Sequence, residues 1–289
     1  MTFVANVKEG FRAFYQRLKR VWWDVHCLYE IAIGRPRTYR PLVLPRLVFP
    51  ADSLYDAVTQ VVVKSPIVES QFKKIYSRWG NHTMVPVISC YNLFTAAKYV
   101  IRANIPGDVC ECGVWQGGSS LIMAETLGAY GETSRIVYMY DTFSGMSEPS
   151  DKDVSLTRNQ RAADLLAKYK KGEQIWCCAS YEEVQANVLL AEYPTENFRL
   201  IAGDVATTLR KIVPAQLSIL RLDTDWYEST KLELEYLFPR LSSGGILMID
   251  DYGIWRGARD AVDEYFRDNK IEGFFHIDPE SGGAMMVKQ

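Results

Sequence analysis

From residue 108 onward, short apolar runs alternate with amphipathic stretches. The runs rich in Ile, Val and Leu are predicted strands at 108–112, 135–141, 198–204, 217–223 and 245–251. The stretches between and after them have apolar residues at helical spacing and are predicted helices at 118–129, 157–170, 181–192, 227–238 and 256–268. This alternation is typical of a parallel sheet with helices on both faces. The final stretch, GFFHIDPESGGAMMVK, predicts a terminal antiparallel hairpin.

The sequence before this alternation divides into two further regions and a leading helix. Residues 1–50 have apolar residues near helical spacing with basic residues between them, and predict a basic helical arm. Residues 51–85 predict a helical lid or cap with helices at 52–64 and 66–78. A helix from residue 86 then opens the main domain, which we expect to span 86–289.

The basic arm permits two interpretations. Its first 40 residues hold eight Lys/Arg against three acids, so a basic amphipathic helix in contact with an anionic membrane surface is one of them. The other is a helical arm that packs on its own domain or on a second subunit. Exposed aromatic residues in this region favour self-association into a homo-oligomer.

Composition narrows the class of protein. A chain of 289 residues with a net charge of −2 accommodates one large α/β domain plus an appendage, and it lacks the basic surplus typical of nucleic-acid binding. The six cysteines have neither zinc-ligand nor disulfide-scaffold spacing, which predicts reduced thiols in a cytoplasmic protein. The apolar run 21–33 is interrupted by Asp24, His26 and Glu30, which argues against a membrane span or signal peptide.

Acidic residues stand at or near the carboxyl end of every predicted strand. Buried carboxylates are costly unless a positive partner meets them. Ligands of open α/β sheets bind outside the carboxyl ends of the strands, so these residues predict one shared site. They are Glu111, Asp141, Asp204, Asp223, Asp250 and Asp251.

The turn after the first strand, DVCECGVWQGGSS, predicts a cofactor loop. Gly113 and Gly117 allow the backbone to turn tightly near a ligand, but the spacing is G-x-x-x-G-G rather than the dinucleotide-binding G-x-G-x-x-G. Glu111 would repel a pyrophosphate and attract the ammonium group of S-adenosylmethionine. Ser119 or Ser120, at the helix start, is placed to hold the methionine carboxylate. The alternative for Glu111 is an ion pair with a nearby arginine.

Two further acids fit an adenosine-containing ligand. Asp141 ends the second strand, where a carboxylate accepts hydrogen bonds from ribose hydroxyls of either NAD or S-adenosylmethionine. Asp204 ends the third, where it would accept from the adenine amino group, cap the helix that begins at Val205, or do both.

The remaining acids predict a metal site. Asp223 and the Asp250–Asp251 pair end two strands that we expect to be neighbours, and magnesium prefers carboxylate oxygens. One alternative is a structural cluster neutralised by an arginine, with three candidates: Arg221, Arg256 and Arg259. Another is the Asp-x-Asp metal motif of nucleotide-sugar transferases.

Together, four motifs resemble the macrocin O-methyltransferase family, whose members are magnesium-dependent enzymes that methylate sugar hydroxyls on antibiotics. The motifs are ECGVWQGGSS, YDTFSGM, LRLDTDWYEST and IDDY, and the resemblance covers about residues 78–289. It implies a Rossmann-like class I methyltransferase fold with a mostly parallel seven-stranded sheet, S-adenosylmethionine as methyl donor, and a small-molecule or glycan sugar as acceptor. Gln116 departs from the family pattern, in which arginine is frequent.

Carried over by position, the resemblance implies a role for each motif residue. Asp223, Asp250 and Asp251 would be metal ligands, and Asp225 the general base. The implied cofactor contacts are Glu111, Gly113, Ser119, Asp141 and Asp204, with Thr83 and Met84 in the segment that closes over the methyl donor. The acids are also placed similarly to those of catechol O-methyltransferases, which have a lysine close to the position of Asp225.

Neighbouring residues leave roles open. The aromatic side chains Trp226, Tyr227, Tyr252 and Trp255 would form an acceptor platform or pack in the core, and His82 would assist at the site or lie on the surface. Two further function classes are a nicotinamide-dependent oxidoreductase, which Glu111 and the glycine spacing disfavour, and a non-catalytic binding protein, which the intact set of acids disfavours.

Overall fold

The computed structural model describes residues 69–169, 177–278 and 281–289, and Ser70–Gln289 form one compact unit. The basic arm predicted at 1–50 and the helix predicted at 52–64 lie outside the described residues. Membrane contact and self-association through the arm therefore stay predictions.

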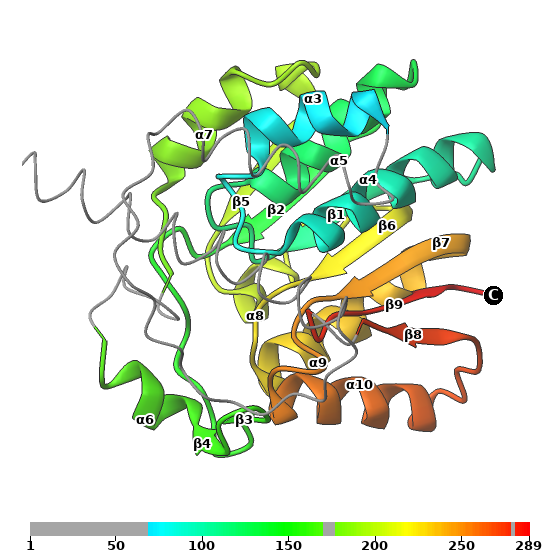
Figure 1. Cartoon of the computed structure of the whole chain (residues 1–289). Coiled ribbons are helices and arrows are strands. Elements are labelled where there is room, and N and C mark those ends of the chain that lie inside the picture. Colours follow the sequence, from blue (N-terminus) through cyan, green and yellow to red (C-terminus); the bar gives the residue numbers. More distant parts are fainter. Residues whose placement is uncertain (1–68, 170–176, 279–280) are drawn as a thin grey trace, which may run out of the picture. The chain divides into compact units, whose positions relative to one another are not determined.

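A seven-stranded sheet forms the centre of the compact unit (Figure 1). Its spatial order is β5-β2-β1-β6-β7-β9-β8, and all neighbours from β5 to β7 are parallel, whereas β9 is antiparallel to both β7 and β8. The strands are β1 Asp108–Cys112, β2 Val137–Asp141, β5 Phe198–Ala202, β6 Leu217–Leu222, β7 Leu241–Ile249, β8 Phe275–Ile277 and β9 Ala284–Val287. The predicted mostly parallel sheet with a terminal antiparallel hairpin is confirmed.

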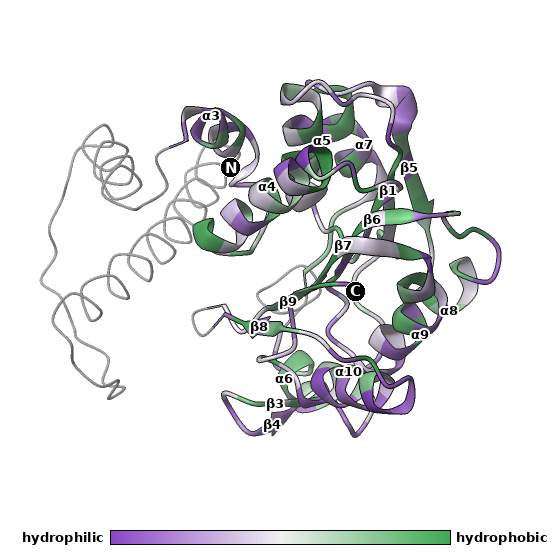
Figure 2. Cartoon of the chain, turned by 90° about the vertical axis from the view of Figure 1, so that its right-hand side faces the viewer, coloured by the Kyte–Doolittle hydropathy of each residue, from purple (hydrophilic) through white to green (hydrophobic). Residues whose placement is uncertain are grey.

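Helices cover both faces of this sheet (Figure 1). One face carries α3 (Ser70–Trp79), α4 (Val87–Arg102) and α5 (Gly118–Ala129), and the opposite face carries α8 (Val205–Thr208), α9 (Tyr227–Leu237) and α10 (Arg256–Asp268). Because both faces are covered, every residue of the central strand β6 is buried. Figure 2 shows the outer helix α10 as largely hydrophilic, in keeping with its exposed side.

Two helix predictions were wrong in extent or type. The helix predicted at 157–170 is replaced by the short strand β4 Gln160–Arg161, which pairs with β3 Val154–Ser155 just before it, and by the short helix α6 Ala162–Leu166. The cause is tertiary. Just before the segment, the Leu156 amide donates to the Ile254 carbonyl oxygen at 2.8 Å in the loop after β7, and the Ala162 amide donates back to the Asp153 carbonyl oxygen at 2.7 Å beside the β3–β4 pair. The helix predicted at 181–192, α7, ends at Leu189, and the chain turns before Pro194.

Candidate active site

A cavity of about 340 Å³ opens at the carboxyl ends of the parallel strands. Ends of parallel strands share one edge of a sheet, so acids that are far apart in the sequence meet there. The acids in its lining are Asp141, Asp204, Asp223, Asp225, Asp250 and Asp251. Five of the six acids predicted at strand ends therefore line one cavity, whereas Glu111 lies outside its wall.

The glycine turn brings β1 and β6 close together. Gly113 lines the cavity at φ +81°, and a Cβ placed there would lie 1.8 Å from the Asp223 carbonyl oxygen. Gly118 likewise approaches His82, whose carbonyl oxygen accepts from the Gly118 amide at 2.9 Å. Close backbone approach, rather than ligand contact alone, requires glycine at these positions.

Asp141 organises the cavity wall. Its carboxylate accepts hydrogen bonds from the backbone amides of Val114 at 2.8 Å, Trp115 at 3.1 Å and Phe143 at 2.8 Å. One side chain thus ties the loop after β1 to the loop after β2, beside the cavity that it lines. Its contact with ribose hydroxyls stays a prediction.

Asp204 lies on the same wall and caps α8. Its Oδ1 accepts from the Ala206 amide at 2.8 Å, which confirms the capping role considered from the sequence. Asp204 also lines the cavity, so contact with an adenine remains an open second role.

Of the other four predicted cofactor residues, three lie outside the cavity lining. Thr83 and Ser119 are buried behind the wall, with their hydroxyls 2.9 Å apart. Gly117 is the residue before α5, at φ +86°, and is not part of the cavity lining. Met84, by contrast, lines the cavity and is 46% exposed. The structure therefore joins the 83–84 segment to the start of α5, with Met84 alone of these residues at the cavity.

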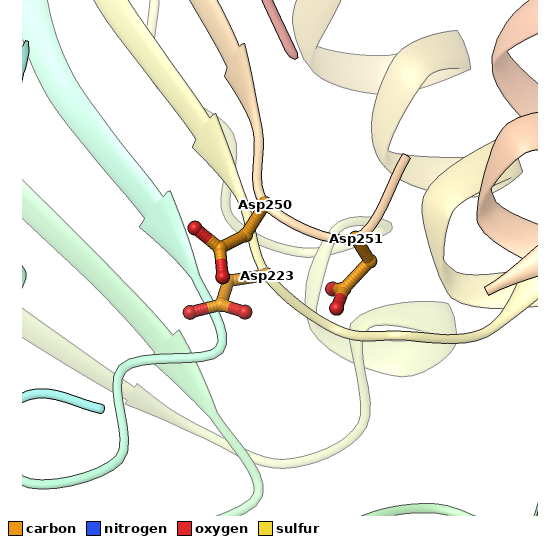
Figure 3. A group of neighbouring side chains, drawn as sticks. All are labelled: Asp223, Asp250 and Asp251. Carbon is orange, nitrogen blue, oxygen red and sulfur yellow. The ribbon is translucent and has the colours of Figure 1, made fainter. Parts of the chain in front are cut away.

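Three aspartates at the ends of β6 and β7 form the predicted cluster (Figure 3). One carboxylate oxygen from each of Asp223, Asp250 and Asp251 lies within 4.8 Å of the others. Asp251 is 5% exposed, whereas the side chains of Asp223 and Asp250 are 27% and 22% exposed toward the cavity. The predicted convergence of these three acids is confirmed.

One buried arginine neutralises part of this charge. Arg221 forms ion pairs with Glu111 at 2.5 Å, Asp223 at 2.6 Å and Asp250 at 2.8 Å. Glu111 is 1% exposed, and its second oxygen accepts from the Ser120 hydroxyl. The arginine partner considered for Glu111 and for the acid cluster is therefore present.

The cluster nevertheless keeps an excess of acid. Among the described residues, Asp225 and Asp251 form no ion pair, so a single guanidinium faces five neighbouring carboxyl groups. Burial, together with the negative charge of neighbouring aspartates, raises the pKa of Asp223 and of Asp251. Burial is the larger cause, and the neighbouring aspartates add to it.

Asp225 is held in an unusual position beside the cluster. It adopts φ +66°, a left-handed conformation that is uncommon for residues other than glycine and is concentrated at functional sites. Its Oδ1 accepts from the Trp255 indole nitrogen at 2.7 Å, and its own amide donates to Asp251 Oδ2 at 3.0 Å. Burial raises the pKa of Asp225 to about 7. Such a carboxylate is a stronger base than an ordinary aspartate.

Several structural contributors were missed from the sequence. Trp255 was considered only as a sugar platform or core residue, yet it lines the cavity and holds Asp225. Asp153 is fully buried and accepts from the Tyr227 amide at 2.8 Å, where it caps α9 from a distant loop. Glu233 is also fully buried and accepts from the Thr224 hydroxyl. No local pattern identifies these contacts, because their partners lie far away in the sequence or on another element.

The other candidate residues are structural in this arrangement. Trp226, Tyr227 and Tyr252 are at most 8% exposed and pack in the core, whereas Trp255 alone of the four aromatic candidates lines the cavity. His82 lies against Trp79, with ring centroids 5.5 Å apart, and is not part of the cavity lining.

The sheet order and a cavity at its carboxyl edge define a class I methyltransferase fold. The chain belongs to the macrocin-O-methyltransferase (TylF) family, whose model matches residues 52–282. It is accordingly an S-adenosylmethionine-dependent O-methyltransferase. This membership overturns the nicotinamide oxidoreductase, nucleotide-sugar transferase and non-catalytic alternatives considered from the sequence.

Named relatives agree with the family assignment. The chain is 37% identical over 187 residues to 8-demethyl-8-(2,3-dimethoxy-alpha-L-rhamnosyl)-tetracenomycin-C 4'-O-methyltransferase of Streptomyces olivaceus, covering 64% of this chain and 67% of the relative. It is 33% identical to demethyldecarbamoylnovobiocin O-methyltransferase of Streptomyces niveus, with the same coverage of both chains. The solved structure of the O-methyltransferase NovP superimposes with a TM-score of 0.63 at 30% identity, covering 72% of this chain and 82% of that one.

The described cysteines and helices can be compared with the expectations of reduced thiols and of no membrane span. The five described cysteines are free thiols. Among the described helices, none has the length and apolar character needed to cross a membrane.

Proposed function

We propose that this enzyme transfers the methyl group of S-adenosylmethionine to a sugar hydroxyl of a small-molecule glycoside, in the biosynthesis of an antibiotic-like metabolite, with the help of a divalent cation. A glycan sugar is a second acceptor class with the same chemistry. The observation that carries the proposal is the adjacency, in one cavity, of Asp141 and Asp204 on one side and the Asp223–Asp250–Asp251 cluster with Asp225 on the other. The relatives named above are methyltransferases of glycosylated antibiotics, which supports the acceptor class.

The donor set suits a hard divalent cation. Three carboxylates line the cavity, and one oxygen of each lies within 4.8 Å of the others. Carboxylate oxygens are ligands that Mg²⁺ prefers. The under-compensated charge of the cluster would be relieved by such an ion. When bound there, the cation would lower the pKa of the acceptor hydroxyl and orient it.

The chain's own residues would perform the remaining steps. Asp141 and Asp204 hold the donor's adenosine end, and the loop at Gly113 lets the donor approach the ends of β1 and β6. The acceptor oxygen attacks the sulfonium methyl in line. The new oxygen–carbon bond forms as the carbon–sulfur bond breaks, and the hydroxyl proton passes to the carboxylate of Asp225. The products are a methyl ether and S-adenosylhomocysteine.

Alignment and proton removal contribute differently to the rate. Holding two reactants in line supplies up to roughly 7–11 kcal/mol in well-oriented systems. A positioned general base typically contributes 10²–10⁴-fold. Trp255 and Asp251 hold Asp225 from two sides, so the base is oriented before the acceptor arrives.

The test combines binding with turnover. Calorimetry of S-adenosylhomocysteine and of Mg²⁺ would establish the two binding sites, and transfer of a labelled methyl group to a panel of glycosides would establish the reaction. We expect Asp225→Asn to retain both binding events and to lose 10²–10⁴-fold in turnover. Asp250→Asn should lose Mg²⁺ binding and retain S-adenosylhomocysteine. Equal turnover in wild type with and without a chelator would contradict the role of the cation.

We propose a cytoplasmic location, because the described thiols are free and the methyl donor, S-adenosylmethionine, is a metabolite of the cell interior.

A further inference from the structure

Arg221 connects three strands at the edge of the site. It lies on the central strand β6, is 2% exposed and is among the largest fully buried side chains. Its Nη1 donates to Glu111 Oε1 and to Asp223 Oδ2, and its Nη2 donates to Asp250 Oδ1. The three acceptors are contributed by β1, by the end of β6 and by the end of β7. A side chain so deeply buried and so heavily paired is part of how this edge is built.

The register of the sheet places Arg221 beside its three acidic partners. Glu111 on β1 is the direct partner of Arg221, and Met248 on β7 is its partner on the other side. Neighbouring residues across parallel strands point to the same face, and so do residues two apart along one strand. Glu111, Asp223 and Asp250 therefore share one face of the sheet with Arg221.

The contacts use one oxygen of each aspartate. Arg221 occupies Asp223 Oδ2 and Asp250 Oδ1, and within the described residues no hydrogen-bond donor reaches the second oxygen of either side chain. The guanidinium has a rigid planar fork, so it orients both carboxylates together. Glu111 is enclosed by Ser120 and Arg221 and does not reach the cavity wall.

We propose that Arg221 is a positioning residue for the divalent-cation site, and that Glu111 acts on this site by holding Arg221 rather than by contacting the methyl donor. The inference rests on the cation dependence in the proposed function. By binding one oxygen of each, Arg221 fixes the orientation of the Asp223 and Asp250 carboxylates within the 4.8 Å cluster. A guanidinium near a cation also repels it, and here the orientation of the two carboxylates outweighs that repulsion.

The first experiment measures Mn²⁺ binding by electron paramagnetic resonance, with S-adenosylhomocysteine calorimetry on the same samples. Arg221→Lys keeps the positive charge and loses the planar guanidinium that binds several carboxylates at once. We expect its Mn²⁺ Kd to rise 10–100-fold, the usual effect of losing a partner of a metal ligand, while S-adenosylhomocysteine affinity changes less than threefold. Arg221→Met removes the charge as well. Tighter Mn²⁺ binding by this variant would show that repulsion dominates and would overturn the proposal.

The second experiment separates the two roles of Glu111. Glu111→Gln should weaken Mn²⁺ binding and leave S-adenosylhomocysteine affinity within threefold of wild type. The reverse result would assign Glu111 to the methyl donor and overturn its proposed role. Glu125→Gln is the matched control, because Glu125 is also a buried acid paired with an arginine, Arg78 at 3.0 Å, and lies outside the cavity lining.

The outcomes for wild type separate this inference from the proposed function. Wild type that binds no Mn²⁺ would contradict the cation dependence itself. Wild type that binds Mn²⁺ together with an unchanged Arg221→Lys variant would overturn only the positioning role. Binding of S-adenosylhomocysteine by each variant shows that the cavity is folded, so a change in Mn²⁺ affinity reports the site and not unfolding.

Discussion

Glu233 offers a quantitative test of the electrostatics behind the active site. It lies on α9, is fully buried, and both of its carboxylate oxygens accept from the Thr224 hydroxyl, at 2.9 and 3.1 Å. Thr224 stands between Asp223 and Asp225, so Glu233 supports the loop that carries the metal ligand and the base. Burial, reinforced by the negative charges of Asp204 and Asp225, raises the pKa of Glu233 from 4.5 to about 8.

This shift makes stability fall as pH rises. Below pH 4.5 the side chain is neutral in both the folded and the unfolded chain. Between 4.5 and about 8 the unfolded chain releases the proton and the folded protein retains it, so unfolding is favoured progressively. At about 1.4 kcal/mol per pKa unit, Glu233 removes roughly 4–5 kcal/mol from the free energy of unfolding across this range. That is a large part of the 5–15 kcal/mol that stabilises most domains.

Replacement of Glu233 by glutamine removes the titration and keeps the shape. We expect Glu233→Gln to lie within about 1 kcal/mol of wild type at pH 5, where the glutamate is mainly protonated in the folded state. Above pH 8 the variant should be the more stable protein, by several kcal/mol. Urea unfolding followed by tryptophan fluorescence at fixed pH from 5 to 9 measures the difference.

The comparison needs a control because other buried acids also titrate. Glu235→Gln changes an exposed glutamate two positions along the same helix and should follow wild type at every pH. The difference between wild type and Glu233→Gln then isolates one group. If the free energies of unfolding of wild type and Glu233→Gln change in parallel from pH 5 to 9, the pKa of Glu233 is not raised, and burial of a protonated Glu233 beneath the loop 223–225 is refuted.

Three further predictions concern the cavity. Burial raises the pKa of Asp225 to about 7, so the base is mainly protonated below this value. Turnover at saturating donor should rise with pH with a midpoint near 7 and level off about one pH unit higher, and bound Mg²⁺ should move the midpoint to lower pH. A rise centred well above pH 7 would contradict the assignment. Trp255→Phe keeps an aromatic ring and loses the indole N–H that donates to Asp225. Steady-state kinetics should show a roughly 10-fold fall in kcat with little change in the KM for S-adenosylmethionine. Gly113→Ala places a Cβ 1.8 Å from the Asp223 carbonyl oxygen at φ +81°, and calorimetry should show loss of S-adenosylhomocysteine binding and a lower Tm; a variant with unchanged Tm and affinity would show that the β1 and β6 loops adjust freely.

The hydrophobic pattern by itself determined most of the fold. The bounds predicted for β1, α5 and α10 are those observed. β1 is a short apolar run buried on both faces, α5 begins directly after the glycine turn, and α10 has one apolar and one polar face. The convergence of the cavity acids followed from sequence as well. Carboxyl ends of parallel strands meet at one edge, so the position of an acid in the strand pattern placed five of the six predicted acids at the cavity, and only Glu111 lies outside its wall.

Pairings between distant residues were decided only by the tertiary structure. The sequence offered three arginines as partners for the acids, and the register that places Arg221 opposite Glu111 brought Arg221 to it. The segment 157–170 has helical periodicity, yet Leu156 just before it is hydrogen-bonded to the loop after β7, and the pairing of β3 with β4 leaves only the short helix α6. Local sequence records which side of an element is buried. It does not record which of several complementary charges or backbone groups lies across the gap, because that choice depends on the register and spacing of elements that fold together.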